Sequence, residues 1–135
     1  YAEIRGLAEK LGVLGRVIFT DRVTEEETMR ALYSAAGLFV MPSLYEGFGL
    51  PPIEAMACGT PVVCSNATSL PEVVGDAAVL VDARNPAEIA QAALTVLTDE
   101  VLRKGMVREG LLRAAQFSEN TISRRLFDVL RDITG

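Results

Sequence analysis

The sequence predicts an α/β fold in which helices cover both faces of a parallel sheet. Three observations lead to this prediction. Short apolar runs alternate with stretches of helical periodicity along the chain, as in strand–helix–strand units. These runs lack polar alternation, as expected of strands that are covered on both faces. Half of the 135 residues are apolar, which is enough for the core of one domain.

Composition argues against several classes of function. The 13 basic and 18 acidic residues give a formal net charge of −5, and no basic run interleaves with aromatic residues, so we expect no nucleic-acid partner. No apolar run reaches the roughly 18 residues of a membrane span, and the first residues do not resemble a signal peptide. The chain has no histidine, which removes Ser-His-Asp chemistry and histidine-based metal sites. Cys58 and Cys64 are expected to be buried, reduced thiols.

The first elements are expected to be a helix and a short strand. Residues 1–11 have apolar positions at helical spacing and stop at Gly12. Residues 17–19, Val-Ile-Phe, form an apolar run that predicts a strand, followed by a turn. Because a doubly wound sheet normally opens on a strand, we also expect a first strand upstream of Tyr1.

A second helix is expected after this turn. Thr24 is the predicted N-cap, with Glu27 at the capping-box position. The apolar stripe of this helix should face the core, and it consists of Met29, Leu32, Tyr33 and Ala36.

Two apolar runs in the centre of the chain, residues 38–41 and 62–64, predict neighbouring strands. A glycine-rich turn at residues 47–49 lies between them. Pro51 has a fixed φ and no N–H, so it suits the first position of a helix. Leu50 precedes a proline and should therefore still be extended.

The turn itself suits an anion. The amides of Phe48, Gly49 and Leu50 would lie at the positive end of the following helix, where a phosphate binds favourably. Glu46 precedes the turn and Glu54 follows it by about one helical turn. Both carboxylates are expected to line the same crevice, at the carboxyl ends of the parallel strands.

The rest of the chain continues the alternation. Residues 70–74 can form one helical turn, and residues 77–81 predict a strand. Asn85 is the predicted N-cap of a helix that runs to about Leu97, with Pro86 at its first position and Glu88 at the capping-box position.

Two more helices should follow, at about residues 100–115 and 118–132. Ser118 would cap the last one, whose apolar face would include Ile122. Four large side chains are assigned to the core: Met29, Phe39, Met41 and Phe127.

The central stretch resembles a known family signature. The matching segments are EGFGLP at 46–51, EAMACGTPV at 54–62 and SLPEVVGD at 69–76. Together they are similar to the retaining glycosyltransferases of the glycosyltransferase-4 type, which have a two-domain GT-B architecture. This resemblance implies a Rossmann-like sheet and the C-terminal, donor-binding half of an enzyme that uses a nucleotide-diphosphate sugar.

The resemblance also implies roles for individual residues. The glutamate that matches Glu54 binds the ribose hydroxyls, and the one that matches Glu46 contacts the transferred sugar, so Glu46 is the candidate catalytic residue. An ionised carboxylate accepts two hydroxyl donors in one plane, which suits both roles. The expected donor-binding residues are Glu46, Gly47, Phe48, Gly49, Leu50, Glu54 and Ser69.

Other implications concern partners and cofactors. The family needs no metal, so we expect no cofactor and no metal ligands. Its acceptor-binding N-terminal domain and the basic pair that neutralises the leaving diphosphate would lie upstream of Tyr1. Many members carry a glycine where this chain has Asp21. A cytoplasmic hexosyltransferase of polysaccharide biosynthesis is expected, with peripheral membrane association of the parent protein left open.

Two alternatives remain at this point. One is another sugar-nucleotide enzyme of the same architecture, such as a 2-epimerase or a phosphorylase. A second is a non-catalytic nucleotide-binding or structural module. A dinucleotide oxidoreductase is disfavoured because its G-x-G-x-x-G should follow the first strand, whereas Gly47-x-Gly49 follows a later one. Base, sugar, acceptor, linkage and oligomeric state stay open.

Overall fold

The centre of the molecule is a parallel sheet of three strands. The computed structural model describes residues 2–20, 22–118 and 120–123. The strands β1 (Phe39–Met41), β2 (Val62–Ser65) and β3 (Val79–Val81) lie in the order β1-β2-β3. Both pairings are parallel, with Val40 opposite Val63 and Cys64 opposite Leu80. The strands predicted at residues 38–41, 62–64 and 77–81 and their parallel arrangement are therefore confirmed.

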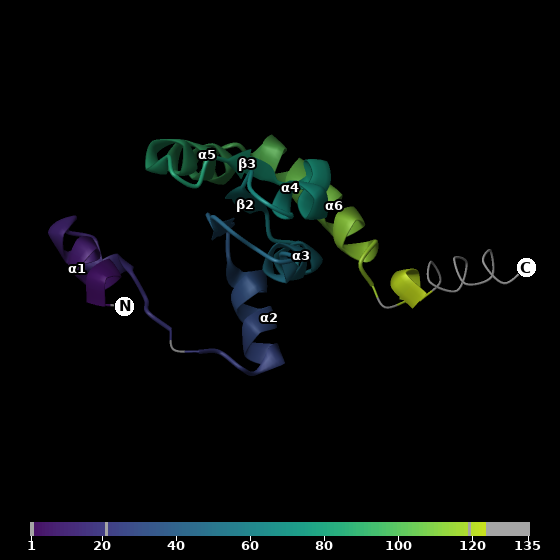
Figure 1. Cartoon of the computed structure of the whole chain (residues 1–135), viewed down its shortest axis with the longest axis horizontal. Coiled ribbons are helices and arrows are strands. Elements are labelled where there is room, and N and C mark those ends of the chain that lie inside the picture. Colours follow the sequence, from purple (N-terminus) through teal and green to yellow (C-terminus); the bar gives the residue numbers. More distant parts are fainter. Residues whose placement is uncertain (1, 21, 119, 124–135) are drawn as a thin grey trace, which may run out of the picture.

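Helices cover both faces of this sheet (Figure 1). The α-helices are α1 (Ala2–Lys10), α2 (Glu26–Ala35), α3 (Leu50–Ala57), α4 (Leu70–Val74), α5 (Pro86–Thr98) and α6 (Glu100–Ala115). Two short 3₁₀ turns, η1 (Leu14–Arg16) and η2 (Gly75–Ala77), lie between them, and residues 120–123 are also helical.

Strand β2 divides the core into two clusters. Val62 and Cys64 pack with residues of α2, α3 and α4, whereas Val63 packs with residues of α5 and α6. All four residues of β2 are buried. Successive side chains of a strand point to opposite faces, so a strand between two helical layers has to be apolar throughout. This confirms the prediction of a sheet covered on both sides.

The predicted core residues and cysteines lie largely where we expected them. Met29, Phe39 and Met41 pack against the first cluster, and Phe127 lies outside the described residues. Both cysteines are free. Cys64 is buried on β2 and Cys58 is partly buried at the end of α3.

The prediction of a strand at residues 17–19 was wrong. The three-stranded sheet does not include them, and Ile18 is 89% exposed. Figure 1 shows α1 and the extended segment after it to one side of the sheet. A strand needs a neighbour that takes its backbone hydrogen bonds. Local sequence can favour an extended conformation here, but it does not determine whether the segment joins the sheet.

The N-cap of α2 was also predicted wrongly. The helix begins at Glu26 with Glu25 as N-cap, so Thr24 lies outside it. Thr28 Oγ1 donates a hydrogen bond to Glu25 Oε2 over 3.1 Å, and acidic residues in the first turn are favoured by the helix dipole. No side-chain hydrogen bond caps the first turn of α2, and its carboxylates favour the helix only through the dipole.

Helix α2 buries a narrower stripe than its apolar pattern suggested. Tyr33 is buried and Met29 is partly buried, but Leu32 is 46% exposed and Ala36 is exposed. The main contact of α2 is with α3. Since neighbouring residues of a helix are rotated by about 100°, Leu32 falls outside the contact that Tyr33 makes.

The later helices follow the predicted boundaries closely. Asn85 caps α5 by accepting a hydrogen bond from the Glu88 amide over 3.2 Å. The Glu88 carboxylate, however, reaches the Asp82 amide instead of closing a capping box. Helix α6 is capped by Asp99, which accepts from the Leu102 amide. Most of the helix predicted for residues 118–132 lies outside the described residues.

Candidate functional site

The candidate site begins where β1 and β2 end. The chain leaves β1 into a loop of residues 42–49 and leaves β2 into a loop of residues 66–69. The Ser65 hydroxyl donates a hydrogen bond to the Ser43 carbonyl and joins the two loops at their base. Because parallel strands end at the same edge, both loops lie at the carboxyl edge of the sheet, where open α/β sheets bind ligands.

The second loop holds the backbone of the first. The Glu46 amide donates to Thr68 Oγ1 over 3.2 Å, and the Ser69 hydroxyl lies 3.3 Å from the Glu46 carbonyl and 3.0 Å from the Phe48 carbonyl. Thr68 has a φ of +55°, which turns its backbone sharply. Ser69, which sequence reasoning placed in the donor site, thus uses its hydroxyl to fix the loop that carries Glu46.

Helix α3 starts one residue earlier than predicted. Gly49 is its N-cap, with a φ of +97°, and Leu50 is its first residue rather than an extended one. Pro51 and Pro52 then occupy positions in the first turn whose N–H groups would have no partner inside the helix. The steric preference of a residue before proline was overridden at Leu50 because the turn at Gly49 already redirects the chain.

Close packing accounts for the glycine at position 49. A Cβ there would lie 2.7 Å from Cδ2 of Leu70, which is completely buried. At Gly47 a Cβ would meet nothing within 4 Å. Gly49 is therefore required by the backbone and by α4, whereas Gly47 lies in open space beside the loop.

The side chains after Glu46 are partly exposed. Phe48 is 50% exposed and meets Phe117 edge to face, with ring centroids 6.0 Å apart. Leu50 is 56% exposed. Arg113 extends this cluster, because its guanidinium lies 5.2 Å from the Phe117 ring centroid.

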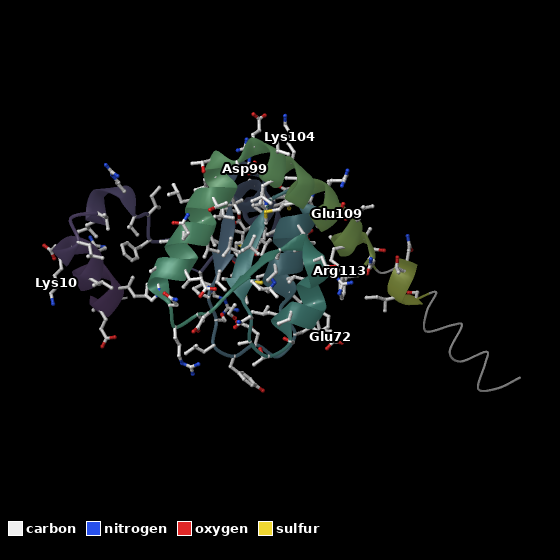
Figure 2. The ribbon with its side chains drawn as sticks, turned by 90° about the horizontal axis from the view of Figure 1, so that it is seen from above. Lys10, Glu72, Asp99, Lys104, Glu109 and Arg113 are labelled. Carbon is white, nitrogen blue, oxygen red and sulfur yellow. The ribbon has the colours of Figure 1, made fainter. Side chains whose placement is uncertain are left out.

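Arg113 also fixes the end of α4. Its Nε donates to the Val73 carbonyl over 2.8 Å, and its Nη2 donates to the Glu72 carbonyl. Figure 2 shows Arg113 on α6 beside Glu72 on α4. A cation is favourable at the carbonyl end of a helix, so Arg113 joins α4 and α6 on one side of the candidate site.

Glu54 is positioned differently from Glu46. It lies in the middle of α3, its side chain is exposed, and Oε2 accepts a hydrogen bond from the Tyr33 hydroxyl over 3.1 Å. Burial and then this hydrogen bond raise the pKa of Tyr33 to about 12. The hydroxyl therefore stays protonated at neutral pH and acts as a donor to the carboxylate.

Glu54 lines two hollows on the surface of the protein. One, of about 370 Å³, lies between α2 and α3 and includes Tyr33 and Arg30 in its wall. The other, of about 430 Å³, lies between α3 and α6 and includes Leu50 and Phe117. Glu46 lines neither of these two hollows, so the two glutamates do not line the same one. Both hollows have Glu54 and Ala57 in their walls.

No group of three or more Cys, Asp or Glu side chains in residues 2–20, 22–118 and 120–123 is arranged to hold a metal ion. In the same part of the chain, no helix has the length and apolar character needed to cross a membrane.

Sequence reasoning missed two residues of this region. Tyr33 was assigned only to the core, although its hydroxyl reaches Glu54 from 21 positions away. Arg113 was not singled out at all. Helical spacing indicated that Tyr33 is buried. No local pattern shows, however, which distant carboxylate or carbonyl the side chain of Tyr33 or Arg113 will contact.

Comparison with known proteins gives a family match over most of the chain. The protein-family model described as "Glycosyl transferases group 1" matches residues 1–113 of this chain. O-antigen chain mannosyltransferase B of Escherichia coli is 53% identical over 93 residues, which cover 69% of this chain and 24% of that protein. The chain thus spans about a quarter of the length of this relative.

Solved structures share the fold. Sucrose-phosphate synthase from Thermosynechococcus elongatus has a TM-score of 0.85 at 32% identity, covering 98% of this chain and 34% of that one. HepE from Anabaena in complex with UDP-glucose has a TM-score of 0.84 at 26% identity, covering 97% and 36% of the two chains. The Rossmann-like α/β architecture predicted from the sequence is the one found in these proteins.

Proposed function

Because the chain belongs to the glycosyl transferases group 1 family, we propose that it is the donor-binding domain of a two-domain, GT-B-type retaining glycosyltransferase. In this proposal the chain supplies the pocket for a nucleotide-diphosphate sugar, and an N-terminal domain outside it binds the acceptor. The 135 residues form one domain of that enzyme.

The observation that carries the proposal is the Glu54 carboxylate. It belongs to an exposed residue of α3, one of its oxygens is held by Tyr33, and Glu54 lines two hollows. A carboxylate with free lone pairs is a natural acceptor for two neighbouring hydroxyls. The complex of HepE with UDP-glucose, at a TM-score of 0.84, supports a ligand that carries such a pair, the ribose of a nucleotide-sugar.

Residues 46–50, at the end of the first loop and the start of α3, would bind the other end of the donor. In the proposed complex, Glu46 contacts hydroxyls of the transferred sugar and is the catalytic residue of this domain. The amides of Phe48, Gly49 and Leu50 approach the diphosphate at the start of α3. They would stabilise the negative charge that develops as the bond between the anomeric carbon and the diphosphate oxygen breaks. Gly47 and Ser69 complete the proposed donor site.

Several finer features belong to the same proposal. The transferred sugar is a hexose, in keeping with the mannosyltransferase name of the E. coli relative, and the acceptor is a glycan, a lipid or a small molecule. Amides and a helix dipole can stabilise a diphosphate without a cation, so we propose that transfer needs no metal. The enzyme would act in the cytoplasm in polysaccharide biosynthesis, at the membrane surface where its acceptor is a lipid.

Calorimetry on the full-length protein tests the ribose role of Glu54. UDP-, GDP- and ADP-sugars are titrated into the wild type and into the Glu54→Gln variant. Hydrogen bonds to a charged acceptor are each worth about 1.5–3 kcal/mol, so the variant should bind the preferred donor roughly ten- to hundred-fold more weakly.

A matched variant controls for the loss of one negative charge. Glu100→Gln, on the exposed first turn of α6, removes only a surface ion pair with Lys104 and should leave the affinity unchanged. Undiminished affinity in Glu54→Gln would remove the ribose assignment. Turnover is expected only from the full-length protein, and efficient transfer by the 135-residue chain alone would contradict the two-domain proposal.

A further inference from the structure

We propose that Tyr33 is a positioning residue for the ribose of the donor. Its hydroxyl holds Oε2 of Glu54 and sets the direction of that carboxylate before the nucleotide arrives. The inference rests on the proposed ribose role of Glu54, and it adds a residue that acts through Glu54 rather than on the donor itself.

Tyr33 is itself fixed from three sides. Its side chain is buried, with 8% of the residue exposed. Its ring meets Phe39 edge to face at 5.4 Å between centroids. Its carbonyl accepts a hydrogen bond from the hydroxyl of Thr60, a residue that is itself 3% exposed. These contacts hold the Tyr33 side chain in place, with its hydroxyl at the edge of the core and within hydrogen-bonding distance of Glu54.

A rigid hydrogen-bond donor restricts the conformations of the Glu54 side chain. This side chain is exposed on α3 and, without a contact, would turn freely about several bonds. Ordering a long side chain at the moment of binding costs conformational entropy. A hydrogen bond from a rigid donor removes much of that cost beforehand, which is how preorganisation raises affinity.

The hydrogen-bond inventory leaves room for the ribose. An ionised carboxylate offers about four acceptor positions on its two oxygens. Tyr33 uses one on Oε2, so the rest of Oε2 and all of Oε1 remain for two vicinal hydroxyls. With a pKa raised to about 12 by burial and by Glu54, the phenol remains a donor across the physiological range. It therefore never repels the carboxylate that it orients.

Tyr33→Phe is the direct test, because it removes only the hydroxyl and keeps the ring against Phe39. The probes are UDP or GDP, whichever the full-length protein binds more tightly, and the 2′,3′-dideoxy form of the same nucleotide. The variant should lose about three- to ten-fold in affinity for the ribonucleotide, the range of one hydrogen bond. Its affinity for the dideoxy nucleotide should stay within about two-fold of the wild type.

A merely structural role would change both affinities together. Equal weakening of the two nucleotides in Tyr33→Phe would therefore overturn the inference, as would unchanged binding of both in a variant series where Glu54→Gln is impaired. Unchanged affinity in Glu54→Gln would instead remove the ribose role itself, and this inference with it. The two failures are thus distinguishable.

The double variant and a hydroxyl control complete the design. Tyr33→Phe combined with Glu54→Gln should bind no more weakly than Glu54→Gln alone, since Tyr33 acts through that carboxylate. Thr98→Val removes a hydroxyl at an exposed position at the end of α5, outside the loops and helices of the candidate site, and should leave both affinities unchanged. Additive losses in the double variant would contradict a role through Glu54.

Discussion

The two glutamates of the candidate site are held in opposite ways. Glu46 lies on a loop and is fixed through its backbone, by Thr68 and Ser69. Among the described residues, no hydrogen bond or ion pair holds its carboxylate. Glu54 lies on a helix and is fixed through its side chain, by Tyr33. A backbone anchor leaves a side chain free to adapt, whereas a side-chain anchor presets its direction.

The difference suits the two ligand parts that we propose for these residues. UDP-, GDP- and ADP-sugars carry the same ribose, so a preset carboxylate at Glu54 is suitable for all three. Sugars differ in the orientation of their hydroxyls, and a carboxylate that can still turn, as at Glu46, suits a variable partner. Three predictions, in order of decreasing effect, test whether the two anchors are independent.

The largest effect is expected at the junction between loop and helix, with Gly49→Ala. The new Cβ would lie 2.7 Å from buried Leu70 at a φ of +97°. Left-handed strain and overpacking together should lower the free energy of unfolding by roughly 2–4 kcal/mol. Urea denaturation measures this, with Gly47→Ala as the control, because a Cβ meets nothing within 4 Å at that position. Similar losses in both variants would contradict the packing argument.

A smaller effect on the free energy of unfolding is expected when Tyr33, which holds the Glu54 side chain, loses its proton at high pH. The pKa of Tyr33 is about 12 in the folded protein, against about 10 for an unperturbed tyrosine. Since the folded state holds this proton more tightly, stability is fully present below pH 10 and falls as the pH rises toward 12. At pH 11, one unit above the unfolded value, the loss is about 1.4 kcal/mol.

Denaturation of the wild type and Tyr33→Phe at pH 8 and pH 11 measures this contribution. The variant should lose about 1.4 kcal/mol less than the wild type between the two values. Burial raises the pKa of the Cys64 thiol to about 11, and its own alkaline loss is common to both proteins and cancels in the difference. Identical losses would show that Tyr33 titrates normally.

The smallest effect is expected from Ser69→Ala. The Glu46 and Phe48 carbonyls lose their hydroxyl donor, which should cost about 1 kcal/mol of stability. Amide hydrogen exchange of residues 42–49 should quicken, while that of α3 should stay unchanged. Ser34→Ala, at an exposed position of α2, is the matched control. Faster exchange at Glu54 as well would show that the two anchors are coupled.

Much of the fold followed from local pattern. The three strands of the sheet and the helices α3 to α6 were predicted because apolar runs, prolines and the Asn85 cap act within a few residues. Residues 17–19 are not part of the sheet, because strand pairing depends on more than local sequence. Thr24 does not cap α2, which begins at Glu26 without a side-chain cap.

The candidate site was predictable in position but not in its anchors. Glu46 and Glu54 were found because they flank a glycine turn between two apolar runs. Their supports come from distant parts of the chain. Tyr33 is 21 positions from Glu54, and Thr68 is 22 from Glu46. Such pairs follow from the way that parallel strands cross over, which no local window contains.

The bond from Arg113 to α4 has a consequence for biosynthesis. Arg113 and the Val73 carbonyl are 40 positions apart, and Gly110 packs against Met56 from the same helix. Chains fold as they leave the ribosome, from the N-terminus onward. The loops that carry Glu46 and Ser69 are therefore synthesised well before α6, the helix that closes over α3 and α4. Until α6 emerges, the nascent chain exposes the apolar side of α3, and this interval is when the domain is most open to aggregation or to chaperone binding.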